Sequence, residues 1–175
     1  KRNILLVDDD AFIIRMLEQT LKLLGFELLH KAEDGVVAVK ILKEVVIDPL
    51  ITDVMMPNMN VLALLKAVRT GQTKAMPSMA TIVVTALMDA ETLAAPMALD
   101  VNGFLTKPFS PALVIKKLLL ALAEENVPTA QSDYQQVVTD LDHLGDNLNI
   151  KQTHAVRHDP GGREKGPLAS LVTLF

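Results

Sequence analysis

Residues 3–123 alternate between two patterns of apolar positions. Short apolar runs, rich in β-branched residues, occupy residues 4–7, 49–52, 81–85 and 103–106. Longer segments between them place apolar side chains at every third or fourth position. The short runs predict buried strands, and the longer spacing predicts amphipathic helices. A more polar run at residues 26–31 predicts a further strand, nearer the edge of a sheet.

The helical pattern occurs five times, at residues 11–24, 35–43, 61–69, 90–99 and 111–124. Gly25 is a typical stop after the first helix, and Ser110 followed by Pro111 is a typical start for the last one. Pro96 lies inside the fourth predicted helix. Because proline lacks a backbone donor, it is expected to kink or shorten that helix.

Continuously apolar strands that alternate with helices predict an α/β fold, because such strands are covered on both faces of a parallel sheet. Right-handed crossovers favour a five-stranded doubly wound parallel sheet with helices on both faces. In sheets of this kind, ligands bind beyond the carboxyl ends of the strands. The residues that end or follow the strands are therefore the candidates for function.

Three acids, a hydroxyl and an amine stand at these predicted strand ends. They are Asp8, Asp9, Asp53, Thr85 and Lys107. Carboxylates gathered at one edge would repel one another unless a cation lies between them. The set offers oxygen ligands and no His or Cys, so it predicts a Mg²⁺ site, for which Mn²⁺ can substitute.

A carboxylate beside Mg²⁺ can act as the nucleophile in phosphoryl transfer and become an acyl phosphate. Asp53, at the end of the third strand, is the candidate for that role. Lys107 offers a positive charge, and Thr85 a hydroxyl donor, for the phosphoryl oxygens. Asp10 is better placed to cap the first helix than to bind metal.

Four motifs resemble those of the response-regulator receiver domain of two-component signal transduction. In chain order they are VDDD at 7–10, ITDVMMPNM at 51–59, VVTA at 83–86 and FLTKPF at 104–109. The likeness covers about residues 2–125. It implies a flavodoxin-like fold with strand order 2-1-3-4-5 and a phosphoryl donor that is a histidine kinase or a phosphotransfer protein.

The resemblance also implies a role for each matching residue. Asp53 is the expected phospho-acceptor, with Lys107 and Thr85 as its catalytic partners. The expected switch residues are Thr85 and Phe104, although Phe104 can also be explained as a core residue. A cis bond is expected before Pro108. The expected metal ligands are Asp8, Asp9, Asp53 and the backbone carbonyl of Met55.

The chain departs from the receiver pattern beside the predicted site. Asn60-Val61 replaces the usual Asp-Gly, so the backbone freedom of glycine is missing from this loop. Asn60 can still cap the third helix. Met55 and Leu87 stand two residues after Asp53 and Thr85 and cannot orient water by hydrogen bonding. We therefore expect slow loss of the phosphoryl group.

Two other functions are compatible with the same residues. The first is a receiver-like module for interaction or dimerisation that works without phosphorylation. The second is a small hydrolase that uses Asp53 as its nucleophile. The hydrolase is disfavoured because no second acid or base lies near Asp53 in sequence.

Composition narrows the function further. The net charge is −4, which disfavours nucleic-acid binding, and the chain has no Cys, which excludes disulfides and thiolate-metal sites. No stretch of 18 apolar residues predicts a membrane span. These features predict a cytoplasmic protein without a membrane partner.

The last part of the chain gives few signals. Residues 1–125 are the predicted receiver domain. Residues 126–175 are expected to be a linker and a C-terminal extension of unassigned fold. This extension could be truncated at Phe175. A polar helix is expected at 135–148 and a short strand at 168–175. His154 and His158 are interpreted as surface residues. Packing of this part on the receiver or in a homodimer is left open.

Overall fold

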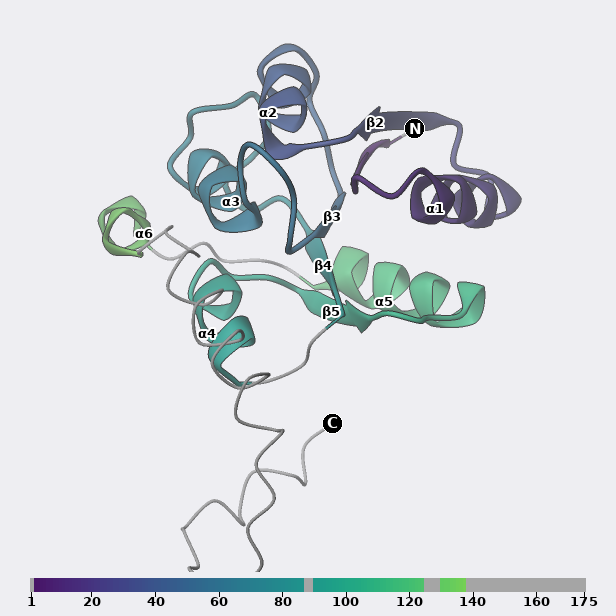
Figure 1. Ribbon diagram of the computed structural model, residues 1–175. Coiled ribbons are helices and arrows are strands. Elements are labelled where there is room, and N and C mark those ends of the chain that lie inside the picture. Colours follow the sequence, from purple (N-terminus) through teal and green to yellow (C-terminus); the bar gives the residue numbers. More distant parts are fainter. Residues whose placement is uncertain (1, 87–89, 125–129, 138–175) are drawn as a thin grey trace, which may run out of the picture. The chain divides into compact units, whose positions relative to one another are not determined.

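The computed structural model describes residues 2–86, 90–124 and 130–137, all within one compact unit, Lys1–Leu141. Five parallel strands form one sheet in the order β2-β1-β3-β4-β5 (Figure 1). The strands are β1 (Asn3–Val7), β2 (Leu28–Ala32), β3 (Leu50–Asp53), β4 (Thr81–Thr85) and β5 (Gly103–Thr106). The helices are α1 (Ala11–Leu23), α2 (Gly35–Glu44), α3 (Val61–Arg69), α4 (Ala90–Met97), α5 (Pro111–Ala123) and α6 (Gln131–Gln136). The predicted fold class and strand order are confirmed.

Helices cover both faces of the sheet. Figure 1 shows α1 and α5 on one side and α2, α3 and α4 on the other. Successive strand residues point to opposite faces, so Leu5 and Val7 join the core under α2 and α3, whereas Ile4 and Leu6 join the core under α1 and α5. All four are at most 1% exposed, which explains why β1 is continuously apolar in sequence.

Short polar side chains cap the N-termini of three helices at the predicted positions. The Asp10 carboxylate accepts a hydrogen bond from the Phe12 N–H at 2.8 Å, and the Asn60 side-chain oxygen accepts one from the Ala63 N–H at 3.0 Å. Ser110 accepts one from the N–H of Leu113 at 3.3 Å. Each contact satisfies a donor that the first helical turn leaves unpaired. The expected caps of α1, α3 and α5 are confirmed.

The fourth helix passes through Pro96 and ends at Met97, two residues before the predicted end. After it, the Leu99 N–H donates to the Pro96 carbonyl at 3.0 Å and the Asp100 N–H to the Met97 carbonyl at 3.1 Å. These three-residue spacings tighten the chain into a turn. The expected shortening is therefore observed.

Other boundaries differ from the sequence-based expectations. The edge strand begins at Leu28, two residues later than predicted, whereas Asp53 ends β3 as expected. Helix α6 begins at Gln131, four residues before the predicted start at 135, and residues 138–148 of that predicted helix lie outside the described residues. The predicted strand at 168–175, and Leu87, His154 and His158, lie outside the described residues.

No helix in the described ranges is long and apolar enough to span a lipid bilayer.

Candidate functional site

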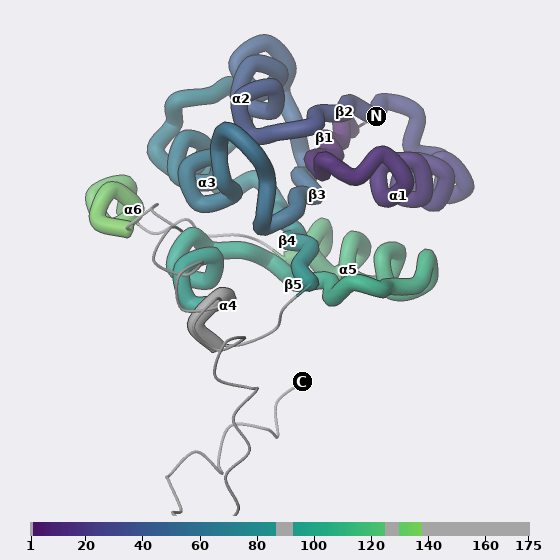
Figure 2. The backbone as a smooth tube through the Cα atoms, in the orientation of Figure 1, coloured from purple at the N-terminus to yellow at the C-terminus, as the bar shows by residue number. Residues whose placement is uncertain are grey.

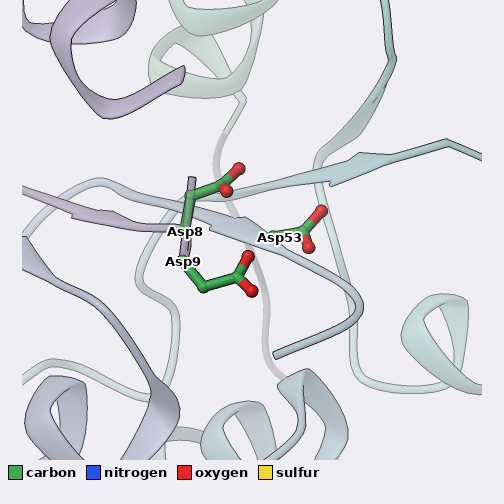
Figure 3. Close-up of side chains that lie close together, drawn as sticks. All are labelled: Asp8, Asp9 and Asp53. Atoms are coloured by element: carbon green, nitrogen blue, oxygen red, sulfur yellow. The ribbon is translucent and has the colours of Figure 1, made fainter. Parts of the chain in front are cut away.

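The carboxyl ends of β1 and β3 bring three acids together. These strands are neighbours in the sheet, so Asp8 and Asp9, which follow β1, lie beside Asp53 at the end of β3. One carboxylate oxygen from each of the three lies within 4.8 Å of the other two. Figure 3 shows the three side chains grouped at this edge. Asp8 and Asp53 are buried, at 2% and 6% exposed, whereas Asp9 is exposed.

Lys107 completes this cluster from the end of β5. Its ammonium nitrogen lies 2.9 Å from Asp8 Oδ2 and 3.1 Å from Asp53 Oδ1. The backbone N–H of Lys107 also donates to the Thr85 carbonyl at 2.8 Å. This hydrogen bond holds the start of the loop after β5 against the end of β4. The peptide bond between Lys107 and Pro108 is cis, as expected from the sequence.

Lys107 contacts two buried carboxylates at this site, and each group changes the pKa of the other. Burial raises the pKa of the Asp53 carboxyl above its ordinary range, and Asp8 adds to this effect, although Lys107 opposes it. Burial alone would lower the pKa of Lys107, but contacts with Asp8 and Asp53 outweigh it and raise that pKa. Lys107 therefore stays charged, and it contacts two of the three carboxylates, those of Asp8 and Asp53.

The donor set fits a hard divalent cation. It consists of carboxylate oxygens from the described residues Asp8, Asp9 and Asp53, without sulfur or imidazole ligands. Asp9 takes part in no other described side-chain contact, and an open pocket of about 440 Å³ reaches both Asp8 and Asp9. Burial is the main reason why the pKa of Asp53 is raised, and added positive charge would relieve the repulsion from Asp8 that adds to it.

The two predicted switch residues lie on neighbouring strands. Thr85 ends β4, is 3% exposed and pairs in register with Thr106 of β5. Phe104, on β5, is partly buried and packs against the core that contains Leu99 and Val83. The structure places both residues near the start of the Lys107 loop, and their switching role stays a prediction.

The loop after Asp53 has a conformation that the sequence did not reveal. Asn58 has a φ of 65°, whereas Asn60 is extended and Val61 is a fully buried first residue of α3. The left-handed residue of this loop is thus an asparagine, which tolerates that conformation better than most residues. The glycine that seemed to be missing at position 61 is not needed there.

Asp34 fastens this loop to the start of α2. Its carboxylate accepts hydrogen bonds from the Val37 N–H at 2.8 Å and the Asn58 amide at 2.6 Å. A Cβ on Gly35 would lie 2.5 Å from the Met59 carbonyl oxygen, so only glycine fits between loop and helix. Sequence reasoning missed Asp34 and Asn58, although an aspartate before a helical Gly is a recognisable cap signal.

Met55 lies in the same loop, two residues beyond Asp53. Met55 is 63% exposed, and its thioether sulfur is at most a weak hydrogen-bond acceptor. The use of its backbone carbonyl as a metal ligand stays a prediction.

Comparison with known proteins identifies the fold family. The response regulator receiver domain family matches residues 4–119. The chemotaxis protein CheY-3 of Vibrio cholerae is 33% identical over 115 residues, which are 66% of this chain and 87% of that protein. The chemotaxis protein CheY of Pseudomonas aeruginosa is 32% identical over 66% of this chain and 91% of its own.

Solved structures agree with this match. The chemotaxis response regulator CheY4 of Vibrio cholerae has 30% identity and a TM-score of 0.63, and the similarity covers 69% of this chain and 98% of that one. A putative response regulator from Chloroflexus aurantiacus also has 30% identity and a TM-score of 0.63, covering 71% and 100% of the two chains. This chain belongs to the response regulator receiver domain family. It is therefore a receiver domain of the kind used in two-component signalling.

Proposed function

We propose that this receiver domain is a phosphorylation switch that accepts a phosphoryl group on Asp53 from a histidine kinase or a phosphotransfer protein. The observation that supports this most is the position of Lys107, whose ammonium group contacts Asp8 and Asp53 at once. A carboxylate suited to act as nucleophile, a positive charge and two further acids thus lie together at the carboxyl ends of the strands. Each group has a use in phosphoryl transfer.

In the proposed reaction, a carboxylate oxygen of Asp53 forms a bond to phosphorus while the bond from phosphorus to the donor histidine nitrogen breaks. The electron pair of the broken bond returns to that nitrogen, which then takes up a proton from water. Lys107 neutralises charge on the phosphoryl oxygens, and Thr85 offers its hydroxyl as a donor to one of them. Burial of Asp53 excludes competing water from the attacking carboxylate.

Asp8, Asp9, Asp53 and the Met55 carbonyl are the proposed ligands for Mg²⁺. When bound, this ion would supply charge neutralisation for the phosphoryl oxygens. Mn²⁺, which prefers the same oxygen ligands, is expected to substitute.

Intact-mass measurement tests the proposal directly. The protein is incubated with Mg²⁺ and a small acyl phosphate, and the wild type is expected to gain the mass of one phosphoryl group. Asp53→Asn should prevent this gain, because the amide is a poor nucleophile. Glu44→Gln, an exposed change at the end of α2, is the control and should be phosphorylated normally.

A module that binds partners without phosphorylation remains the alternative. This alternative is supported if folded wild-type protein gains no phosphoryl group under these conditions. Homodimer formation and a cytoplasmic location stay predictions in both cases.

A further inference from the structure

Residues 130–137, which we call the C-terminal clasp, pack against α3 and the turn between α4 and β5. The Tyr134 side chain is 1% exposed, and its hydroxyl donates to Asp100 Oδ2 at 2.5 Å. Lys66 of α3 donates to the carbonyl oxygens of Gln135 and Val137 at 2.7 and 2.9 Å. Figure 2 shows α6, the helix of the clasp, next to α3.

The helix of the clasp is too short to be stable alone. It has six residues, and Ala130 at its start makes no side-chain capping bond. Isolated helices of this length are not populated in water, because nucleation costs more than a few hydrogen bonds return. Tyr134 and the Lys66 contacts therefore hold the helix in place. This is the pattern of a peptide ligand with one aromatic anchor in a groove.

The clasp contacts a turn that leads into the switch region. Asp100, which binds Tyr134, has a φ of 51° and begins the connection to β5. From the other side, the buried guanidinium of Arg69 donates to the carbonyls of Leu99 and Asp100, both at 2.9 Å. The turn is thus fixed between Arg69 of the receiver and Tyr134 of the clasp.

The same apolar cluster joins the clasp to the predicted switch aromatic. Tyr134 and Leu99 are buried in this cluster, and Phe104 and Val137 pack against it. Phe104 lies on β5, which is followed directly by Lys107, the residue bound to Asp8 and Asp53. One short strand, β5, thus connects the apolar cluster under the clasp to the loop that carries Lys107.

We propose that the C-terminal clasp is an intramolecular ligand of the receiver domain whose docking is coupled to phosphorylation of Asp53. This coupling rests on the proposed function. The docked clasp stabilises the α4–β5 turn in the arrangement in which Lys107 contacts two carboxylates. A phosphoryl group on Asp53 takes Lys107 as its own partner and repacks Phe104, which weakens docking. By reciprocity, a weakened clasp favours the phosphorylated protein.

Hydrogen exchange on the full chain tests the first half of this coupling. The protein is phosphorylated with a small acyl phosphate and Mg²⁺, and intact mass confirms the modification in the same sample. Amides of residues 130–137 should then exchange at least about fivefold faster, the lower end of typical coupling between sites. Unchanged exchange in a sample with a confirmed phosphoryl group overturns the coupling and leaves the proposed function intact. If no phosphoryl group can be added, the proposed function fails and the coupling fails with it.

Variants test the reciprocal half. Tyr134→Phe removes the hydroxyl that binds Asp100, and Lys66→Met removes the amine that binds two carbonyls of the clasp while keeping its aliphatic stem. Each should raise the phosphorylated fraction at a limiting donor concentration. Gln136→Ala, an exposed change on the same helix, is the control and should match the wild type. If the wild type and the three variants are phosphorylated equally, docking of the clasp is not coupled to phosphorylation.

Discussion

Asp34 links the start of α2 to the loop that follows Asp53. Its carboxylate is shared between the Val37 N–H and the Asn58 amide, which also stabilises the left-handed conformation of Asn58. The hydrogen bond from Val37 is the main reason why the pKa of Asp34 is lowered, and the bond from Asn58 adds to it. The ionised form of this side chain therefore stabilises the fold.

The lowered pKa predicts a pH-dependent contribution of Asp34 to stability. Because the folded pKa is below the unfolded one, the contribution is present above about pH 3.9 and disappears as pH falls through the folded value. Asp34→Asn should be less stable than the wild type at pH 7 in urea unfolding, and the difference should shrink toward low pH. Glu44→Gln, an exposed change at the end of the same helix, should show neither effect. A difference that is constant with pH would mean that the charge of Asp34 is not its source.

Because Met55 stands two residues after Asp53, we expect an acyl phosphate on Asp53 to be lost slowly. The exposed thioether of Met55 cannot orient a water molecule for attack on a phosphoryl group at Asp53. Met55→Asn adds a hydrogen-bonding group at this position, and a net hydrogen bond of about 1 kcal/mol corresponds to about fivefold faster loss. The loss is followed by intact mass after donor removal. Met76→Asn, at another exposed methionine, should decay like the wild type; equal decay of all three would exclude this role for Met55.

At the scale of secondary structure elements, Arg69 joins α3 to three other segments. It is 1% exposed, and its guanidinium donates to the carbonyls of Pro77, Met79, Leu99 and Asp100 and contacts the Thr81 hydroxyl. A buried cation of this kind is favourable only because every donor finds an acceptor. The end of α3, the start of β4 and the turn after α4 are therefore fixed by one side chain.

Replacing Arg69 should destabilise the whole domain. Arg69→Met preserves much of the volume but removes hydrogen bonds to four carbonyls that are buried or partly buried, at about 1–3 kcal/mol for each acceptor left without a donor. We expect a loss of roughly 3 kcal/mol or more in the free energy of unfolding, measured with urea. Arg15→Met removes an exposed arginine from α1 and should change stability by less than about 0.5 kcal/mol. A loss below 1 kcal/mol for Arg69→Met would contradict this account.

Elements whose signals are local were predicted well from sequence. Asp10, Asn60 and Ser110 cap helices through contacts within three residues, so their spacing alone places the helix starts. The arrangement of Asp8, Asp53 and Lys107 could also be predicted, because the carboxyl ends of parallel strands meet at one edge. For these parts, the fold and the site follow from periodicity and strand order.

The remaining features depend on contacts between distant segments. Arg69 resembled an ordinary basic residue at the end of a helix, since nothing near it in sequence reveals acceptors that lie 8 to 31 residues away. Helix α6 has a polar sequence that does not favour a helix by itself, and it is stabilised by Tyr134 and Lys66. The link between Asp34 and Asn58 spans 24 residues. Such contacts become visible only when the chain is folded.

At the scale of the whole molecule, the proposed metal site depends on folding. Asp8 follows β1 and Asp53 ends β3, so the two come together only when β1 and β3 pair. In the unfolded chain these carboxylates are far apart on average, so a divalent cation has little affinity for that state. Binding to the folded state alone raises its stability by mass action.

Mg²⁺ should therefore stabilise this protein through Asp9. At a concentration 100 times the dissociation constant, the gain is about 2.7 kcal/mol, observed as a higher urea midpoint that a chelator reverses. Asp9→Asn should remove most of this gain, and in metal-free buffer it should not lower stability, because the change removes one of three carboxylates that repel one another. Glu44→Gln removes an exposed carboxylate elsewhere and should keep the full gain. If Mg²⁺ stabilised Asp9→Asn as much as the wild type, Asp9 would not be a ligand, and the ion would be held by Asp8 and Asp53 without it.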